Sequence, residues 1–253
     1  MARFVAPAGV VDYRARYHEL RILGSPTTLA LGAARSDAYR ETGVHMLPPG
    51  ALQHVDSVID VGANVGRWSS LLLTVCSPKK LLAVEPSEVV LPSLRCALAA
   101  NRNAEVVPVA AGPWSGSVQF HVTAHSHNAS VLEPRSDEMD QIYGYGWQLD
   151  RVETVPQRTV DDIASGLSEI TVLKFDVQGY ESAALSGATE TLRRTKYIII
   201  EVTFRSHYEG DTTFPDLHKL ITNKGFFLRS VSQPFHRSSQ ALWADAVYER
   251  VGR

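Results

Sequence analysis

The feature that most constrains the fold is an apolar run that ends in a glycine-containing turn and leads into an amphipathic segment. Val58–Val61 is typical of a buried strand, and Asp60–Gly66 reads Asp-Val-Gly-Ala-Asn-Val-Gly. One helical face then follows at Trp68, Leu71, Leu72 and Val75. Glycine permits positive φ and the close approach of a ligand, and the start of a helix offers free N–H groups to an anion. This pattern predicts a ligand-binding turn where a parallel strand ends.

The same alternation of short apolar runs and helical periodicity continues along the chain. Further strands are predicted at Leu81–Val84, Val106–Ala110, Val172–Phe175 and Ile198–Ile200 with Val202. Helices are predicted around Leu91–Leu98 and Leu185–Leu192. Strands that alternate with helices indicate a parallel sheet covered on both faces. The alternation over Trp243–Glu249 predicts an edge-type antiparallel strand paired with Phe226–Leu228.

The composition is ordinary for a globular protein and points to no highly charged partner. The chain has 253 residues, of which 44% are hydrophobic and 21% charged, with a formal net charge of −2. We therefore expect no nucleic acid and no membrane partner, and no apolar stretch is long enough to cross a bilayer. Cys76 and Cys96 form neither a disulfide framework nor a metal-binding pattern. Since the start lacks a signal-peptide pattern, we expect a cytoplasmic protein.

The chain is expected to have one main domain with two additions. Residues 1–50 are predicted to be an N-terminal helical extension, with a helix over Val11–Ile22, that caps the site or forms a dimer contact. Residues 51–253 form the main domain. Within it, residues 121–158 have mixed polarity and weak strand signals. Because long structureless connections are uncommon in compact domains, this stretch is expected to be a hairpin with a lid.

The spacing of the glycines in the turn distinguishes between cofactors. A dinucleotide fingerprint has glycines at its first, third and sixth positions. Here Gly62 is followed by Asn64 at the third position, and Gly66 comes one residue early. Asp60 also precedes the first glycine, where a pyrophosphate needs no acid but an ammonium group does. These residues favour S-adenosylmethionine, which carries an ammonium and a sulfonium. A Walker loop is excluded because no Gly-Lys-Ser/Thr follows.

Glu85 supplies a contact for a ribose. It ends the second predicted strand and is followed by Pro86. A carboxylate at this place can accept hydrogen bonds from both ribose hydroxyls. A nicotinamide cofactor has the same ribose, so Glu85 supports a nucleoside without choosing the cofactor. Small residues after the third strand, including Ala111, suit the flat adenine ring.

Five ordered motifs together resemble the FkbM family of methyltransferases. They are Asp60–Gly66, Glu85-Pro86, Thr159–Asp162, Val172–Glu181 and Ile200–Val202. The resemblance implies a Rossmann-like class I methyltransferase, an α/β fold with a mostly parallel seven-stranded sheet, a reversed C-terminal strand and helices on both faces. It also implies methyl transfer to hydroxyl groups of sugars or of complex natural products.

Two carboxylates are candidates for the chemistry at the acceptor. Asp176 and Glu201 end adjacent inner strands, so we expect them at the same edge of the sheet. A hydroxyl is a weak nucleophile, so one acid can serve as a general base, or both can hold a Mg²⁺ ion that lowers the hydroxyl pKa. In the alternative, Lys174 neutralises one carboxylate and Glu201 forms a structural salt bridge, because Lys174 and Asp176 share a face.

Histidine and aromatic residues are the remaining candidates. His127, in the predicted lid, and His207, after the Glu201 strand, are placed to reach an acceptor as a general base. Tyr143–Trp147 puts aromatic rings on a glycine-hinged loop. These rings either stack on a sugar or pin the loop to the domain.

These observations predict an S-adenosylmethionine-dependent O-methyltransferase. Its expected partner is a small-molecule or oligosaccharide acceptor, methylated on a hydroxyl of a saccharide or glycosylated metabolite. A homodimer is a further expectation. A nicotinamide-dependent oxidoreductase and a non-catalytic cofactor-binding interaction protein are the alternatives.

Overall fold

The computed structural model of the chain describes residues 43–237 and 239–252. The helix predicted at Val11–Ile22 lies outside these residues. In the described part, no helix has the length and apolar character needed to span a membrane.

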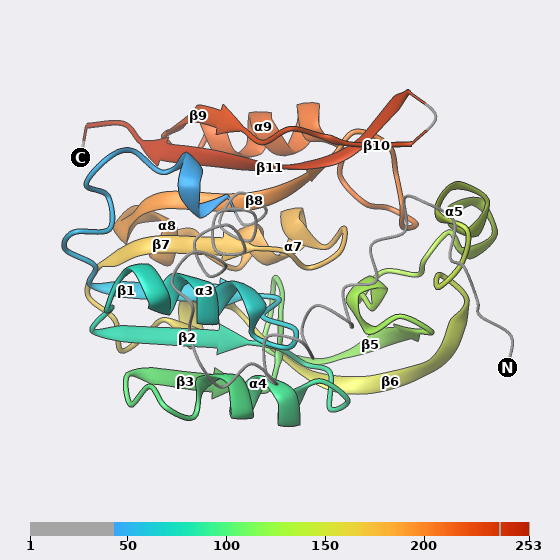
Figure 1. Cartoon of the computed structure of the whole chain (residues 1–253), viewed down its shortest axis with the longest axis horizontal. Helices are drawn as coiled ribbons and strands as arrows, with labels where there is room; N and C mark the ends of the chain where they lie inside the picture. The colour runs from blue at the N-terminus through green and yellow to red at the C-terminus, as the bar shows by residue number, and fades with distance from the viewer. Residues whose placement is uncertain (1–42, 238, 253) are drawn as a thin grey trace, which may run out of the picture. The chain divides into compact units, whose positions relative to one another are not determined.

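The main sheet has the strand order β10-β11-β8-β7-β1-β2-β3, with β9 paired to β11 (Figure 1). Its strands are β1 (Ser57–Val61), β2 (Lys80–Val84), β3 (Ala104–Val107), β7 (Ile170–Phe175), β8 (Thr195–Thr203), β9 (Phe226–Val231), β10 (Phe235–Arg237) and β11 (Gln240–Arg250). The first five of these run parallel, while β11 is antiparallel to β8 and β9. This arrangement confirms the predicted class I sheet with a reversed C-terminal strand. The short β10 makes it an eight-stranded sheet over the described residues.

The position of β11 differs from the prediction. Its pairing with Phe226–Leu228 is as expected, but β11 lies between β8 and β9 and is not an edge strand. The alternating polar residues Asp245 and Glu249 suggested an edge strand. In the structure they have intermediate exposure although the strand lies inside the sheet. The neighbouring Val247 and Tyr248 are fully buried, as an interior strand requires.

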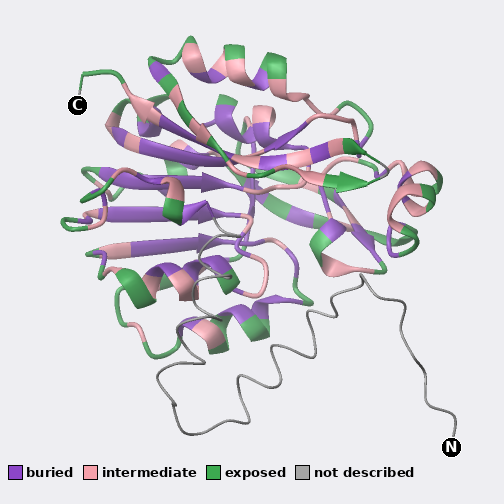
Figure 2. Ribbon diagram, turned by 45° about the horizontal axis from the view of Figure 1, so that its top comes forward, coloured by how far each residue is buried: buried purple, intermediate pink, exposed green. Residues whose placement is uncertain are grey.

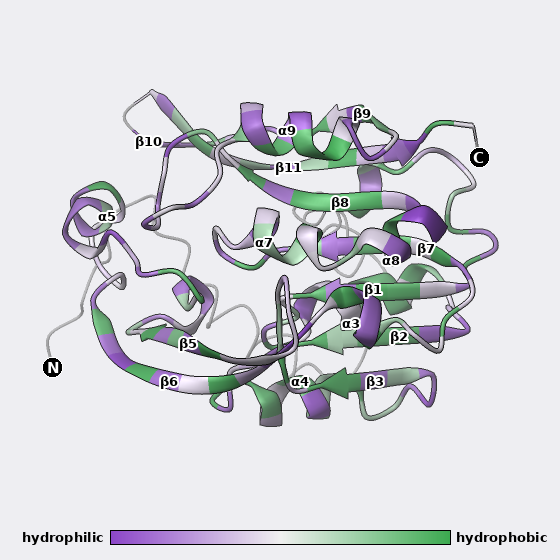
Figure 3. Ribbon diagram, turned by 180° about the vertical axis from the view of Figure 1, so that it is seen from behind, coloured by the Kyte–Doolittle hydropathy of each residue, from purple (hydrophilic) through white to green (hydrophobic). Residues whose placement is uncertain are grey.

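Helices cover both faces of the main sheet (Figure 2). On one face, α3 (Arg67–Val75) and α4 (Leu91–Leu98) pack in a core cluster with Val58 of β1. Ile59, which points to the other face, belongs to the cluster that contains α7 (Glu181–Ser186) and α9 (Phe214–Thr222). In Figure 3 the strands β2, β3 and β8 of this sheet are largely green, that is, hydrophobic.

The helix predicted around Leu185–Leu192 is two helices, α7 and α8 (Thr189–Arg194). The chain turns between them at Gly187, where a Cβ would lie 2.1 Å from the carbonyl oxygen of Gly112. The α8 N-terminus is held by Asp161, whose carboxylate accepts from the backbone N–H groups of residues 190 and 191. Asp161 itself lies in α6 (Val160–Ile163). One apolar pattern thus forms two helices, because the chain turns at Gly187 and the Asp161 carboxylate binds the N–H groups at the start of α8.

A second, smaller sheet lies beside the carboxyl ends of the main strands. Its order is β4 (Ala110–Ala111), β6 (Leu149–Arg158) and β5 (Gly116–Thr123). The strand predicted at Val106–Ala110 is therefore divided between β3 and β4. β5 and β6 form an antiparallel hairpin. The chain between them contains η2 (Ser126–Asn128) and α5 (Ser136–Tyr143), and a further short helix, η1, is formed by Val44–Met46.

Candidate active site

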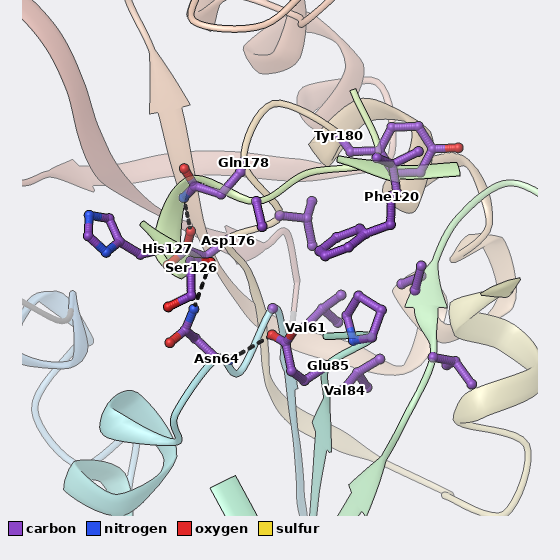
Figure 4. A pocket seen from close by; sticks show the side chains of 18 residues that line it. Val61, Asn64, Val84, Glu85, Phe120, Ser126, His127, Asp176, Gln178 and Tyr180 are labelled. Carbon is purple, nitrogen blue, oxygen red and sulfur yellow. Dashed lines mark hydrogen bonds between the residues drawn. The ribbon is translucent and has the colours of Figure 1, made fainter. Parts of the chain in front are cut away.

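A cavity opens where β1, β2 and β7 end, below the hairpin (Figure 4). Seven of the residues predicted from the sequence line it: Gly62, Asn64, Glu85, Pro86, Ala111, His127 and Asp176. The cavity therefore lies at the edge of the sheet where ligands of open α/β folds bind.

The turn after β1 needs glycine for reasons of conformation and space. Gly62 has φ +83, and a Cβ there would lie 1.8 Å from the carbonyl oxygen of Asp176. Asn64 also has a positive φ of 48, and its Oδ1 accepts from the backbone N–H of Val65 at 2.8 Å. Gly66 has φ +82 and lies outside the cavity lining, where a Cβ would meet Leu94 of α4 at 2.8 Å. Gly62 therefore brings two turns together at the cavity, while Gly66 serves helix packing.

Glu85 is a buried acid at the wall of the cavity. Its side chain accepts from the backbone N–H groups of Asn64 at 2.8 Å and Ser87 at 2.9 Å (Figure 4 shows the first). Burial raises the pKa of Glu85 to about 7, although both hydrogen bonds oppose this shift. Each carboxylate oxygen has a second lone pair for a ligand hydroxyl. The side chain therefore holds the Asn64 turn in place and keeps lone pairs that can accept from a ligand hydroxyl.

Asp60 occupies a different place from the one predicted. Its carboxylate is fully buried, accepts from the Ser69 hydroxyl at 2.6 Å and pairs with the Lys174 ammonium at 3.1 Å. It does not line the cavity. Alternation along β1 puts Asp60 on the α3 side of the sheet, together with Val58. In this structure Asp60 therefore pairs with the Lys174 ammonium, on the side of the sheet away from the cavity lining.

Lys174 also reaches the candidate base. Its ammonium lies 3.4 Å from Asp176 Oδ2, and the Asp176 side chain is 36% exposed toward the cavity. Burial opposes the charge on Lys174, but Asp60 and Asp176 outweigh it and hold the pKa of Lys174 above its ordinary value. The other Asp176 oxygen accepts from Gln178 Nε2 at 2.7 Å. The ion pair with Lys174 that the sequence left open is therefore present, but its single ammonium is shared by Asp60 and Asp176 and cannot neutralise both.

Glu201 lies outside the cavity lining, on β8 opposite Asp245 of β11. Burial and the nearby carboxylates of Asp176 and Glu181 raise the pKa of Glu201 well above its usual range. In the described part of the chain, no group of three or more His, Cys, Asp or Glu side chains is placed to hold a metal. The Mg²⁺ site predicted on Asp176 and Glu201 is therefore not supported.

The two candidate histidines have different surroundings. His127 is exposed, lines the cavity, and stacks on His125 with ring centroids 5.3 Å apart. His207 is buried away from the cavity, where its Nε2 lies 2.7 Å from the Tyr143 hydroxyl and its ring stacks on Trp147. Burial lowers the pKa of His207 to about 4. The stack of His207 on Trp147 therefore holds the segment between β5 and β6 (residues 124–148, the hairpin segment) against the domain. Of the two roles considered for Trp147, this is the structural one.

This contact predicts a local response to acid. Unfolded His207 binds a proton below about pH 6.5, while the folded residue stays neutral to about pH 4, so acidification favours opening. Between about pH 7 and pH 5, the opening free energy of α5 should fall by roughly 2 kcal/mol. Hydrogen exchange of the α5 amides measures this opening free energy, after correction for the pH dependence of the intrinsic exchange rates. The His207→Gln variant is the control; the same fall in that variant would contradict the assignment to His207.

Several cavity residues were missed by the sequence analysis as individual candidates. Gln178 and Tyr180 lie in a motif that was recognised only as a whole, and Phe120 and Ser126 come from the hairpin. Ser126 closes over the first turn, because its carbonyl accepts from Asn64 Nδ2 at 3.4 Å (Figure 4). The sequence pattern concerns polar residues where parallel strands end. Phe120 and Ser126 do not follow such a strand and reach the cavity only through tertiary packing, so this pattern does not predict them.

The parallel sheet with one reversed strand is the class I methyltransferase fold, and the acid at the end of β2 beside a glycine turn lies in its cavity. Residues 60–228 match the family described as the Methyltransferase FkbM domain. The chain belongs to this family, and the nicotinamide-dependent alternative is thereby set aside.

Two relatives illustrate the similarity. The chain is 28% identical over 178 residues to the 2-O-methyltransferase NoeI of Sinorhizobium fredii (strain NBRC 101917 / NGR234). This alignment covers 66% of the present chain and 72% of NoeI. The crystal structure of a methyltransferase FkbM from Methylobacillus flagellatus KT superposes with a TM-score of 0.54 at 18% identity. That match covers 84% of this chain and 47% of the other, so this chain spans about half the length of that structure. This second likeness supports the fold.

Proposed function

We propose that the chain transfers a methyl group from S-adenosylmethionine to a hydroxyl of a saccharide or glycosylated metabolite. The observation that carries the proposal is the Asp176 carboxylate, which lines the same cavity as Glu85. An acid for the ribose and an acid for the acceptor thus share one space. The similarity to a relative named as a 2-O-methyltransferase favours oxygen as the methylated atom.

The cavity residues fit the cofactor from two sides. Glu85 binds the ribose hydroxyls, and Gly62 and Asn64 keep the first turn open to the amino-acid end. Pro86 and Ala111 form the wall for the adenine ring. When bound, S-adenosylmethionine supplies an electrophilic methyl group. The protein's contribution is to hold the acceptor oxygen in line and close to it.

At the acceptor, Asp176 takes the hydroxyl proton. A hydroxyl is a weak nucleophile, and an acid within hydrogen-bonding reach assists its attack. The Lys174 ammonium lies 3.4 Å from Oδ2 of this carboxylate and helps to fix its position. His127, exposed at the same cavity, is the second candidate for contact with the acceptor. The segment between β5 and β6 acts as the lid, and the hydrogen bond from Asn64 Nδ2 to the Ser126 carbonyl oxygen holds it against the first turn.

The cofactor half of the proposal is tested by calorimetry with S-adenosylhomocysteine. Glu85→Ala should weaken binding by about 30- to 100-fold, because it removes a charged acceptor for two hydroxyls. Glu88→Ala, an exposed acid on the same loop, is the matched control and should bind normally. Equal affinities for the two variants, or binding of NAD in place of S-adenosylhomocysteine, would contradict the assignment.

The acceptor half is tested by mass spectrometry. A panel of sugars and glycosylated metabolites should contain a compound that gains one methyl group, and the gain should require the cofactor. Intact S-adenosylhomocysteine binding with no product on any hydroxylated compound would favour the non-catalytic interaction protein. Light scattering of the full chain tests whether residues 1–50 support a homodimer.

A further inference from the structure

Gln178 lines the cavity beside Asp176 and is the centre of a hydrogen-bond network. Its Nε2 donates to Asp176 Oδ1 at 2.7 Å, and its Oε1 accepts from the Tyr208 hydroxyl at 3.0 Å (Figure 4 shows the first bond). Its backbone carbonyl accepts from the Ser130 hydroxyl at 2.7 Å. Gln178 has φ 54, which is unfavourable for a residue with a side chain, and Gly179 follows with φ 89. The surrounding contacts therefore hold a conformation that the backbone alone disfavours.

Tyr208 is fixed from several sides. Its side chain is buried, and its backbone N–H and that of His207 donate to Asp211 Oδ2. Its ring lies against Gly179, where a Cβ would be 2.8 Å from Tyr208 Cδ2. The hydroxyl also lies 3.0 Å from the carbonyl oxygen of Asn128 in the hairpin segment. Burial raises the pKa of Tyr208 well above its ordinary value, so the hydroxyl keeps the proton that it donates.

The chemistry of these groups allows only one direction for the network. An ionised carboxylate can only accept, so the Gln178 amide must turn its NH₂ group to Asp176. The amide oxygen then faces the Tyr208 hydroxyl and shares its single proton with the Asn128 carbonyl oxygen, which lies at the same distance of 3.0 Å. Removing that hydroxyl leaves the amide oxygen without this partner and frees the amide to turn. The orientation of Asp176 thus depends on a residue that does not contact it.

We propose that Gln178 and Tyr208 are positioning residues that hold the Asp176 carboxylate toward the acceptor hydroxyl. This inference rests on the proposed function of Asp176. It adds a link to the hairpin segment, because Ser130 and Asn128 from that segment contact Gln178 and Tyr208. Placement of the hairpin and orientation of the base therefore belong to one network.

Steady-state kinetics of two variants test the proposal. Tyr208→Phe should lower kcat by about tenfold and Gln178→Leu by about a hundredfold, while KM for the cofactor changes by less than about threefold. Tyr248→Phe is the matched control, since this buried hydroxyl hydrogen-bonds to His218 in the core and should leave kcat unchanged. A merely structural role would instead lower the melting temperature and cofactor affinity together, with kcat preserved in the folded fraction. That result would overturn the proposal.

A crystal structure of the Gln178→Leu variant with S-adenosylhomocysteine separates this inference from the proposed function. The Asp176 carboxylate should leave the orientation it has in the wild-type complex, while the Gly62 turn stays in place. An unmoved carboxylate would overturn the network whatever the acceptor is. Failure of the wild-type chain to methylate any hydroxyl would overturn the proposed function, and the crystal structure would still decide the network.

Discussion

Replacing Lys174 with methionine is expected to lower the free energy of unfolding by about 3 to 5 kcal/mol. The substitution leaves the Asp60 carboxylate in the core with the Ser69 hydroxyl but without its cation. An uncompensated buried charge is among the most destabilising single changes. Urea denaturation followed by circular dichroism measures the effect.

A surface ion pair provides the matched control for this prediction. Lys80→Met removes the pair with Glu105, whose two side chains are 37% and 55% exposed, and should cost at most about 1 kcal/mol. Combining Lys174→Met with Asp60→Leu should recover much of the lost stability, because the only carboxylate then left without the ammonium is that of Asp176, which is 36% exposed. If Lys174→Met is as stable as Lys80→Met, the buried pair does not have the role assigned to it.

The second large effect is expected at the candidate base. Asp176→Asn keeps the side-chain shape and an oxygen for Gln178, but it removes the group that takes the proton. We expect kcat to fall by about 10²- to 10⁴-fold, with S-adenosylhomocysteine affinity changed by less than about threefold. Product formation measured by mass spectrometry gives the rates, and calorimetry gives the affinity.

Two further variants make this experiment specific. Asp216→Asn, an exposed acid on α9, should leave kcat unchanged. Glu201→Gln should cost much less than Asp176→Asn, because Glu201 lies outside the cavity lining. A larger loss in Glu201→Gln would show that the base is Glu201.

The cofactor side of the site was largely predictable because its signals are local in the sequence. Gly62 and Asn64 belong to one turn, and Glu85 directly ends a strand, so strand order alone brings them together. The family motifs also predicted the reversed strand, which pairs as expected with β9. These features depend on backbone topology more than on side-chain packing.

Side-chain partners were less predictable for a physical reason. Alternation along β1 and β7 shows that two residues share a face, but it does not show that the Lys174 ammonium lies between Asp60 and Asp176. His207 has a buried aromatic neighbour from a segment far away in the chain, which no local spacing reveals. Gln178 has φ 54, a conformation that propensity alone assigns to glycine.

The place of β11 has a consequence for the order in which the protein can mature during synthesis. β11 follows β8 and β9 in the sequence but is inserted between them. Until Gln240–Arg250 has left the ribosome, β8 therefore has a long, apolar, unpaired edge that can associate with other chains. The nascent chain holds its cofactor turn and Glu85 early but completes its sheet late. Pairing with β11 removes that edge by covering β8 along Tyr197–Thr203.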